Sequence, residues 1–359
     1  MEKNIILLTA MGDYRKKVMS HLMTSANKST TLMAGVLPFD LTIKILNPNE
    51  IDFEKVSNFY FLNRKFMIQA ASPIRLLSCK TLLVDLNPRI LNLWFILGLR
   101  KLLGKKNIVW GHAWPRDGSK SGTAVIRKLL CKLADTIIVY TETQANELRS
   151  ELPHKKIIAA PNALYYKKEI SFAANSNRTK ILYVGRLVKE KKPAVLLEAF
   201  MQESLLDRSD IELYFIGTGP EKEILERKVS QSCDQVKQRI HFLGHINNYE
   251  ELKKHYDSSF ISVSPGYVGL SITQSFSFGV PMLISQDEPH APEIEAAKLG
   301  LNSFYFKTDC PDDLAKKILD IWTNRIHWME SGPAIADDCR SSYSAENMSS
   351  RISDALEQV

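Results

Sequence analysis

Short apolar runs bounded by turn residues alternate with longer amphipathic stretches along the whole chain of 359 residues. Such alternation is typical of βαβ units, in which parallel strands are joined by helices. In the first half the pattern predicts helices at Tyr14–Ser25 and Gly122–Leu133, and strands at Asn4–Thr9, Thr30–Ala34, Leu41–Leu46, Thr81–Leu86, Asn107–Trp110, Thr136–Tyr140 and Lys156–Ala159.

The alternation starts afresh in the second half. It predicts strands at Lys180–Val184, Glu212–Ile216, Ile240–Leu243, Ser259–Val263 and Met282–Ile284, and helices at Ala194–Glu203, Lys222–Cys233, Glu250–Asp257 and Ile272–Phe278. The polar, aperiodic stretch Tyr165–Arg178 is expected to be the most exposed linker.

The chain length fits two domains rather than one core. We expect an α/β fold of two doubly wound, Rossmann-like domains facing across a cleft, at residues 1–165 and 166–340. A C-terminal helix within 341–359 is expected to return to the N-terminal domain. Ligands of such folds bind outside the carboxyl ends of the strands, so the loops after the strands are the places to seek chemistry.

Charge is distributed unevenly between the two halves. Residues 1–165 hold 24 Lys and Arg against 12 Asp and Glu, a net charge of +12, whereas the remainder holds 23 against 28, a net charge of −5. A basic half favours an anionic partner, such as a phosphorylated acceptor or an anionic membrane surface. The sequence has no helix-turn-helix, RNA-binding or zinc-finger signature, so nucleic acid is disfavoured.

Three further features bear on the setting of the protein. The five cysteines are widely spaced and form no Cys-x-x-Cys pair, which favours a reduced compartment and no structural zinc. The N-terminus is expected to be a first strand and not a signal peptide. The apolar run Ile90–Leu103 is too short to span a bilayer. It is expected to be a buried helix or, alternatively, an interfacial helix that presents Arg100, Lys101, Lys105 and Lys106 to lipid head groups.

The most informative stretch is residues 179–200, in which a strand delivers Arg186 and Lys191 into one turn before a helix begins. Gly185 lets the chain turn there. The guanidinium fork of Arg186 and the point charge of Lys191 suit a diphosphate. Without the strand-to-helix context, both would be read as solvated surface cations.

Other loops after strands carry weaker signals. Gly12 and Asp13 follow the first strand, and His112 and Arg116 lie in a loop with two tryptophans. Gly217, Gly219 and Pro220 open a later helix, although a Gly-x-Gly is equally expected in a purely structural turn. Gly266, Tyr267 and Gly269 lead through Leu270 and Ser271 into the helix that holds Gln274. His290 and Glu293 follow the next strand.

Four motifs in order give the chain a resemblance to a known family. Val-Gly-Arg-Leu-Val-Lys-Glu-Lys, Phe-Ile-Gly-Thr-Gly-Pro, Ile-His-Phe-Leu-Gly-His and Gly-Leu-Ser-Ile-Thr-Gln-Ser-Phe-Ser-Phe-Gly-Val-Pro fall within about 179–300. Together they resemble glycosyltransferase family 4, the retaining transferases of GT-B fold, in the form found in bacterial surface-polysaccharide synthesis. The first half resembles the family less, through Trp-Gly-His and Pro161-Asn162.

The resemblance implies roles for individual residues. Arg186 and Lys191 would hold the donor diphosphate and assist its departure, and His112 would lie near the transferring sugar. The donor-binding residues would be Gly185, Gly217, Gly219, Pro220, Ile246, Gly269, Leu270, Ser271 and Gln274. Contacts to donor sugar or acceptor are expected from Gly12, Asp13, Arg116, Tyr267, His290 and Glu293. By the same resemblance, residues 1–165 would bind the acceptor and residues 166–340 the nucleotide sugar.

The sequence departs from the family at one motif. The family has two glutamates separated by seven residues, and here Gly266 and Gln274 occupy those positions. Gln274 retains hydrogen-bonding atoms for a ribose. Gly266 has no side chain to hold a hexose, and Glu293 and His290 are candidates to replace the lost contact.

The resemblance implies a hexosyl- or related glycosyltransferase that moves a sugar from a nucleotide diphosphate to a hydroxyl of a lipid-linked glycan, without metal or other cofactor. We expect it at the inner face of the cytoplasmic membrane, bound peripherally through its basic N-terminal half. Two alternatives remain open: a catalytically silent nucleotide-sugar-binding protein, which would explain the lost glutamates, and a nucleotide-sugar epimerase of the same fold.

Overall fold

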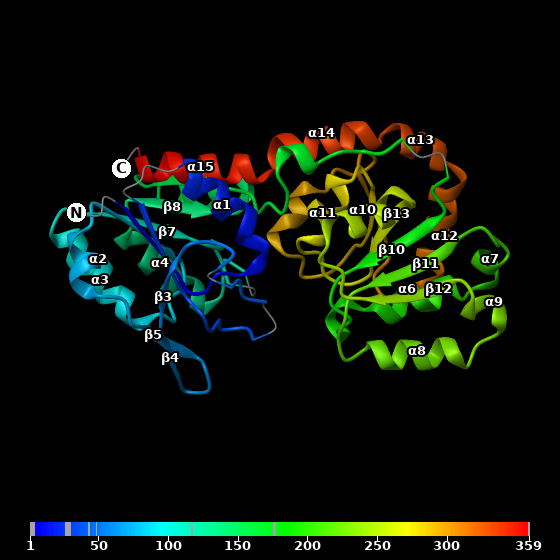
Figure 1. The fold of residues 1–359 in the computed structure, drawn as a ribbon, viewed down its shortest axis with the longest axis horizontal. Helices are drawn as coiled ribbons and strands as arrows, with labels where there is room; N and C mark the ends of the chain where they lie inside the picture. Colours follow the sequence, from blue (N-terminus) through cyan, green and yellow to red (C-terminus); the bar gives the residue numbers. More distant parts are fainter. Residues whose placement is uncertain are drawn as a thin grey trace. The chain divides into compact units, whose positions relative to one another are not determined.

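The computed structural model describes residues 4–25, 30–41, 44–47, 49–115, 118–174 and 177–357. Contacts divide the chain into two compact units (Figure 1). The first unit comprises Met1–Tyr166 together with Tyr343–Val359, and the second comprises Lys167–Ser342. The sequence placed these divisions after residues 165 and 340.

The first unit is built on a parallel sheet whose strands, within the described residues, follow the order β3-β2-β1-β6-β7-β8-β9. The order reverses direction at β1, as in a doubly wound sheet. The strands are β1 (Asn4–Leu8), β2 (Thr30–Gly35), β3 (Glu54–Val56), β6 (Thr81–Asp85), β7 (Lys106–Trp110), β8 (Thr136–Val139) and β9 (Lys156–Ala159).

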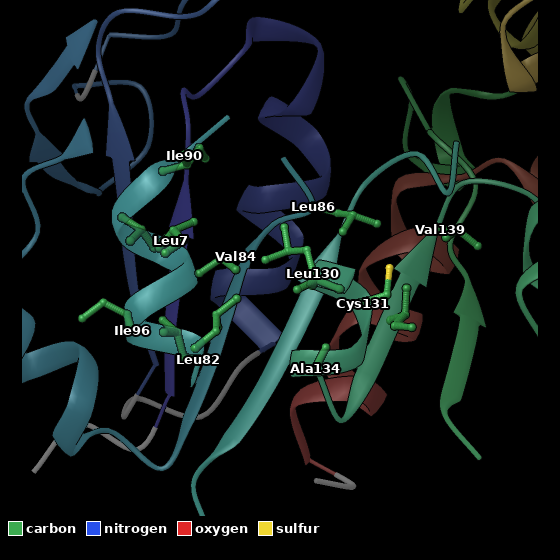
Figure 2. Packing of buried hydrophobic residues seen from close by; sticks show 14 of the residues in the cluster. Leu7, Leu82, Val84, Leu86, Ile90, Ile96, Leu130, Cys131, Ala134 and Val139 are labelled. Atoms are coloured by element: carbon green, nitrogen blue, oxygen red, sulfur yellow. The ribbon is translucent and has the colours of Figure 1, made fainter. Parts of the chain in front are cut away.

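Helices cover both faces of this sheet. One face packs against α2 (Pro73–Ser78), α3 (Leu91–Leu102), α4 (Gly122–Leu133) and α5 (Glu142–Glu151) through a single apolar cluster. Figure 2 shows part of it, with Leu82 and Val84 of β6 beside Ile96 of α3, and Leu130 of α4 near Leu86. The continuous apolar runs of these strands are explained by burial on both faces.

The other face packs against α1 (Lys16–Ser25) and α15 (Ala345–Glu357), which lie side by side (Figure 1). His21 Nδ1 lies 2.7 Å from the Ser349 hydroxyl, and Arg351 donates to the carbonyl of Ala159 at 3.1 Å. The last helix of the chain therefore belongs to the core of the first unit.

One expected strand of the first unit is wrong. Of the stretch Leu41–Leu46, Thr42 and Ile43 lie outside the described residues; Leu41 is in a turn with 65% of its surface exposed, and Ile45 makes only an isolated bridge to Gly12. The edge of the sheet is β3 instead, followed by an antiparallel hairpin, β4 (Asn58–Phe61) and β5 (Phe66–Gln69), which the sequence pattern did not reveal.

The second unit repeats the architecture with a parallel sheet in the order β12-β11-β10-β13-β14-β15 over its described residues. The strands are β10 (Lys180–Val184), β11 (Glu212–Ile216), β12 (Ile240–Gly244), β13 (Ser259–Ser264), β14 (Met282–Ser285) and β15 (Ser303–Phe306). Its helices are α6 (Pro193–Phe200), α7 (Glu203–Leu206), α8 (Lys222–Ser230), α9 (Asp234–Lys237), α10 (Tyr249–Asp257), α11 (Ser271–Ser277), α12 (Pro311–Thr323), α13 (Arg325–Glu330) and α14 (Gly332–Ser342).

The expected exposed linker, Tyr165–Arg178, is only partly exposed over its described residues, and from Lys167 on these belong to the second unit. Ile170 and Arg178 are 1% and 2% exposed. The Arg178 guanidinium donates to the carbonyls of Tyr256 and Ser259, each at 3.0 Å. The polar composition of the stretch suggests a linker. The burial of Arg178 could not be seen in the sequence, because its partners are backbone carbonyls and not particular side chains.

Arg100 of α3 is fully buried, so it does not face lipid as the interfacial alternative supposed. Its guanidinium donates to Asn107 Oδ1 at 2.9 Å and to the carbonyls of Leu76, Cys79, Lys80 and Lys106. It therefore anchors α3 to its neighbours. Across the described residues, no helix is long and apolar enough to cross a membrane. The five cysteines are not joined by disulfides.

Candidate functional site

The turn after β10 carries Arg186 at the carboxyl edge of the second sheet. The Tyr183 hydroxyl donates to the Arg186 carbonyl at 2.7 Å, and the amides of Gly185 and Leu187 bond to the carbonyls of Ile216 and Thr218, both at 2.9 Å. These bonds fix the backbone while the Arg186 side chain stays exposed. The guanidinium is thus presented to ligand from a rigid base.

The two glycines of the Gly-x-Gly motif allow that turn to pack. Gly217 and Gly219 adopt φ angles of 148° and 155°, which favour glycine. A Cβ on Gly217 would lie 1.8 Å from the Gly185 carbonyl oxygen, and one on Gly219 would lie 2.2 Å from that of Leu187. The motif therefore has a structural reason for its glycines, whether or not a ligand also approaches it.

Lys191 ends the short 3-10 turn Lys189–Lys191 before α6. Its Nζ donates to the Tyr267 carbonyl at 2.7 Å and lies 3.6 Å from the centroid of the Tyr267 ring. The Tyr267 hydroxyl accepts from Arg186 Nη2 at 3.2 Å. The structure therefore brings Arg186, Lys191 and Tyr267 together, and we call these three residues the cation cluster.

Gly266 is packed against the turn that carries Lys191. A Cβ at this position would lie 2.4 Å from the carbonyl oxygen of Glu190 and 2.7 Å from the carbonyl carbon of Lys191. Since real Cβ atoms do not approach backbone so closely, no side chain fits at 266 in this arrangement. The family's first glutamate is therefore sterically excluded here, not merely absent. Gln274, at the second glutamate position, is half-buried on α11.

His290 holds the loop that follows Gly266. Its Nδ1 accepts from the Val268 amide at 3.0 Å, so Nε2 carries the proton and donates to the Ser285 carbonyl at 2.9 Å. Burial lowers the pKa of His290, which favours this neutral form. Both ring nitrogens are thus used by backbone groups. Glu293, in the 3-10 turn Pro292–Ala296, is buried.

The remaining predicted donor-binding residues lie at the same edge of the second sheet. Pro220 is exposed in the turn before α8, and Ile246 is half-buried beyond β12, whose last residue, Gly244, accepts from the Gly217 amide at 2.7 Å. Leu270 and Ser271 start α11, and Gly269 precedes them. A Cβ added to Gly269 would lie 3.7 Å from Lys191 Nζ.

A separate cavity of about 580 Å³ lies beside β14 and β15, lined by Gln286, His290, Leu299, Phe304, Tyr305 and Lys317. Only His290 among these belongs to the predicted site. This cavity is therefore not where the cation cluster lies.

The first unit has a cavity of about 330 Å³ at the carboxyl edge of its own sheet. Two of the candidate site residues, Gly12 and His112, line it together with Thr9, Ala10, Tyr14, Arg15, Pro38, Phe39, Asp40, Asp85, Leu86, Asn87, Arg89, Trp110, Gly111, Arg127 and Tyr140. The exposed His112 ring packs edge-on against the Tyr140 ring, with 4.7 Å between the ring centroids. Asp13 lies outside the lining, its amide bonded to the Lys44 carbonyl at 2.9 Å, and Arg116 lies outside the described residues.

Sequence reasoning missed a buried charge network in this cavity. Arg15 Nη1 lies 3.7 Å from Asp85 Oδ1, and Nη2 donates to the Tyr140 hydroxyl at 2.9 Å. The guanidinium carbon lies 4.3 Å from the centroid of the Trp110 ring. Burial by itself would lower the pKa of Arg15, but Tyr14, Tyr140 and Asp85 together raise it above its usual value. The position of Asp85 at the carboxyl end of β6 was the available signal.

The second unit matches a known family. Residues 167–333 match the model of the family described as glycosyl transferases group 1. This unit is a group 1 glycosyl transferase domain. The expected resemblance is thereby confirmed for the half of the chain that carried its motifs.

Curated relatives of this chain include two from Escherichia coli. They are the O-antigen biosynthesis glycosyltransferase WbnH and the probable O-antigen biosynthesis glycosyltransferase WbiN, each 27% identical over 194 residues. The match covers 52% of this chain. It covers 53% of each relative, so the chain spans about half the length of the curated relatives it matches.

Solved structures resemble the whole chain. A structure of Anabaena HepE in complex with UDP has a TM-score of 0.72 at 11% identity, covering 99% of this chain and 100% of that one. Sucrose-phosphate synthase from Thermosynechococcus elongatus has a TM-score of 0.69 at 14% identity, covering 99% and 98%. The apo lipopolysaccharide outer core galactosyltransferase WaaB has a TM-score of 0.66 at 14% identity, covering 99% of each chain. The expected GT-B class of fold is confirmed by these structures.

Proposed function

We propose that the protein is a retaining glycosyltransferase that moves a sugar from a nucleotide diphosphate to a hydroxyl of a lipid-linked glycan. The observation that carries the proposal is the cation cluster within a group 1 glycosyl transferase domain. The glycan would belong to a bacterial surface polysaccharide, such as O-antigen, capsule or exopolysaccharide.

The chemistry follows from the charge that develops on the leaving diphosphate. As the bond between the anomeric carbon and the phosphate oxygen breaks, Arg186 and Lys191 neutralise the new negative charge. The acceptor oxygen then bonds to the anomeric carbon on the face that the diphosphate leaves, and its proton passes to an oxygen of the diphosphate. The proposal gives to the two cations the neutralising role that a metal ion has in other transferases.

Among the described residues, no group of three or more His, Cys, Asp or Glu side chains could hold a metal ion. The proposal places the nucleotide beside Gly217–Pro220 and Ile246, with the ribose near Gln274 and the phosphates near the amides of Gly269 and Leu270. His290 would support the loop, rather than contact the sugar, because its ring nitrogens are bonded to backbone, whereas Glu293 stays a candidate for contact with the sugar.

The names of the similar proteins support this choice of reaction. Two are O-antigen biosynthesis glycosyltransferases, one is a lipopolysaccharide galactosyltransferase, and one was solved with UDP. Three of these names state a bacterial surface polysaccharide, and the fourth states the nucleotide UDP.

A lipid-bearing acceptor is supported by the outer surface of α2, α3 and α4. These helices contain no aspartate or glutamate. They and the residue after α3 expose large apolar side chains, namely Ile74, Leu91, Phe95, Leu102, Leu103, Val125, Ile126 and Leu129. Exposed lysines accompany them, including Lys101, Lys106 and Lys132. We call this surface the apolar-basic face.

A surface that exposes both apolar side chains and lysines fits the head-group region of an anionic bilayer. The other faces of α3 and α4 pack into the core through Leu93, Ile96, Leu97 and Leu130, so both helices carry apolar side chains on their exposed sides as well as on their buried ones. The proposal therefore places the protein peripherally on the inner face of the cytoplasmic membrane.

The proposal is tested by a thermal-unfolding screen of nucleotide sugars with the wild type and with Arg186→Ala/Lys191→Ala. A ligand at 100 times its dissociation constant stabilises the native state by about 2.7 kcal/mol. We expect one nucleotide sugar to raise the unfolding temperature of the wild type and to have a much smaller effect on the variant. The absence of any stabilising nucleotide sugar would contradict the proposal, and binding without transfer to any acceptor would favour the catalytically silent alternative.

A further inference from the structure

Two arginines of the first-unit cavity have no role in the network around Arg15. Arg127 projects from α4, and its Nη1 donates to the carbonyls of Leu86 and His112 at 2.9 and 2.8 Å. Arg89 follows β6, stacks on the Phe39 ring at 3.8 Å and donates through Nε to Asn87 Oδ1 at 3.2 Å. Both line the cavity.

Neither guanidinium is neutralised by a carboxylate in the described part of the chain. Two carboxylates line the cavity. Asp85 is engaged by Arg15 and by the Thr9 amide, and Asp40 lies at the exposed rim. Burial lowers the pKa of Arg127, and the charge of Arg89 lowers it further, so the two cations repel each other electrostatically. Like charges held together in a half-buried cavity are stabilised when an anion binds between them.

The positions of the two arginines relate the cavity to the apolar-basic face. Arg127 lies on the same helix as the exposed side chains of Val125, Ile126 and Leu129. Arg89 lies two residues before Leu91, the first exposed apolar residue of α3. Both cavity-lining cations thus belong to, or lie two residues from, helices of the surface proposed to meet lipid.

We propose that Arg89 and Arg127 bind the diphosphate that joins an acceptor saccharide to its lipid. The receiving sugar then occupies the cavity, and the lipid runs along the apolar-basic face. Two planar guanidinium forks match the two phosphoryl groups of a diphosphate better than the single group of a carboxylate. A cavity of about 330 Å³ is at the small end of ligand sites, which suits an acceptor whose receiving sugar lies next to the diphosphate. The assignment to an acceptor rests on the proposed function, whereas the anion site itself does not.

The test measures binding of inorganic pyrophosphate, by calorimetry, to the full chain carrying Arg186→Ala/Lys191→Ala, which removes the cation cluster of the second unit. In that background we expect Arg89→Gln to weaken binding about tenfold or more, as for the loss of charge-assisted hydrogen bonds. Arg127→Lys, which keeps the charge but loses the fork, should weaken it less. Lys55→Gln, an exposed charge on β3 outside the cavity, is the matched control and should bind as its parent does.

Farnesyl diphosphate and glucuronate distinguish the possible sources of the anion. The proposal expects farnesyl diphosphate to bind more tightly than pyrophosphate, because its chain reaches the apolar-basic face. Equal affinity for the two would overturn the lipid assignment. Tighter binding of glucuronate than of pyrophosphate, or pyrophosphate binding unaffected by Arg89→Gln, would overturn the diphosphate site.

This experiment needs neither donor nor turnover. Failure of the nucleotide-sugar screen with pyrophosphate still bound at Arg89 would contradict the proposed function alone. Loss of the pyrophosphate site with an intact nucleotide-sugar response would contradict only the inference about Arg89 and Arg127.

Discussion

Gly266 packs directly against Lys191, with room for no side chain between them. A Cβ at position 266 would lie 2.7 Å from the Lys191 carbonyl carbon and 2.8 Å from its Cα. The lost glutamate and the position of the proposed catalytic lysine are therefore two aspects of one packing arrangement. Restoring the acidic residue would displace the lysine.

Gly266→Ala is accordingly expected to destabilise the second unit by about 1–3 kcal/mol, as overpacking does. Gly269→Ala is the matched control in the same loop, because its Cβ would meet only Lys191 Nζ at an ordinary 3.7 Å. Chemical denaturation compares the two. Gly266→Glu should fail to raise transfer above the wild-type rate, and equal stability of the two alanine variants would contradict the packing argument.

His290 should make the stability of the second unit depend on pH. Burial lowers its folded-state pKa below the ordinary value of 6.5, so the unfolded chain takes up a proton first as pH falls. The free energy of unfolding is therefore expected to be highest above about pH 6.5 and to decrease below it. His255, whose pKa is also lowered by burial, contributes in the same direction.

Unfolding by urea at pH 5 to 7.5 checks this expectation for the wild type and for His290→Gln. The variant should lose less stability between the upper and lower pH than the wild type does. A pH dependence that is the same in both proteins would show that His290 is not held neutral by the loop.

The apolar-basic face should bind anionic vesicles. Phe95 and Leu102, 71% and 85% exposed, would enter the head-group region of the bilayer. Replacing both by serine should weaken binding to phosphatidylglycerol-containing vesicles about tenfold or more, given the apolar area removed. Added salt should weaken wild-type binding as well, because the lysines of the face act through screened charge.

Phe59→Ser is the control for vesicle sedimentation, since Phe59 is 59% exposed on β4, outside the three helices of the apolar-basic face. It should sediment like the wild type. Equal losses in Phe59→Ser and Phe95→Ser/Leu102→Ser would contradict a defined membrane face.

The parts predictable from sequence are those determined by local pattern. Strand periodicity placed Arg186 and Lys191 at the carboxyl edge of a sheet, and the alternation of elements gave both doubly wound units. Contacts between distant residues were not predictable. Arg15 and Tyr140 are separated by 125 positions, and only the folded sheet joins them. The burial of Arg100 and Arg178 depends on backbone carbonyls, which no residue type marks. The exposure of Phe95 runs against its apolar character.

The central claim is that Lys191 and Arg186 stabilise the departing diphosphate, and transfer by Lys191→Ala tests it most directly. Once a donor and an acceptor are known, the rate of glycosyl transfer is measured for the wild type, for Lys191→Ala and for Lys189→Ala, an exposed lysine in the same turn. We expect Lys191→Ala to lose about 10²–10³-fold in rate with its fold intact, as when a charge-stabilising donor is removed, while Lys189→Ala stays near the wild type. Transfer by Lys191→Ala at a substantial fraction of the wild-type rate would contradict the account.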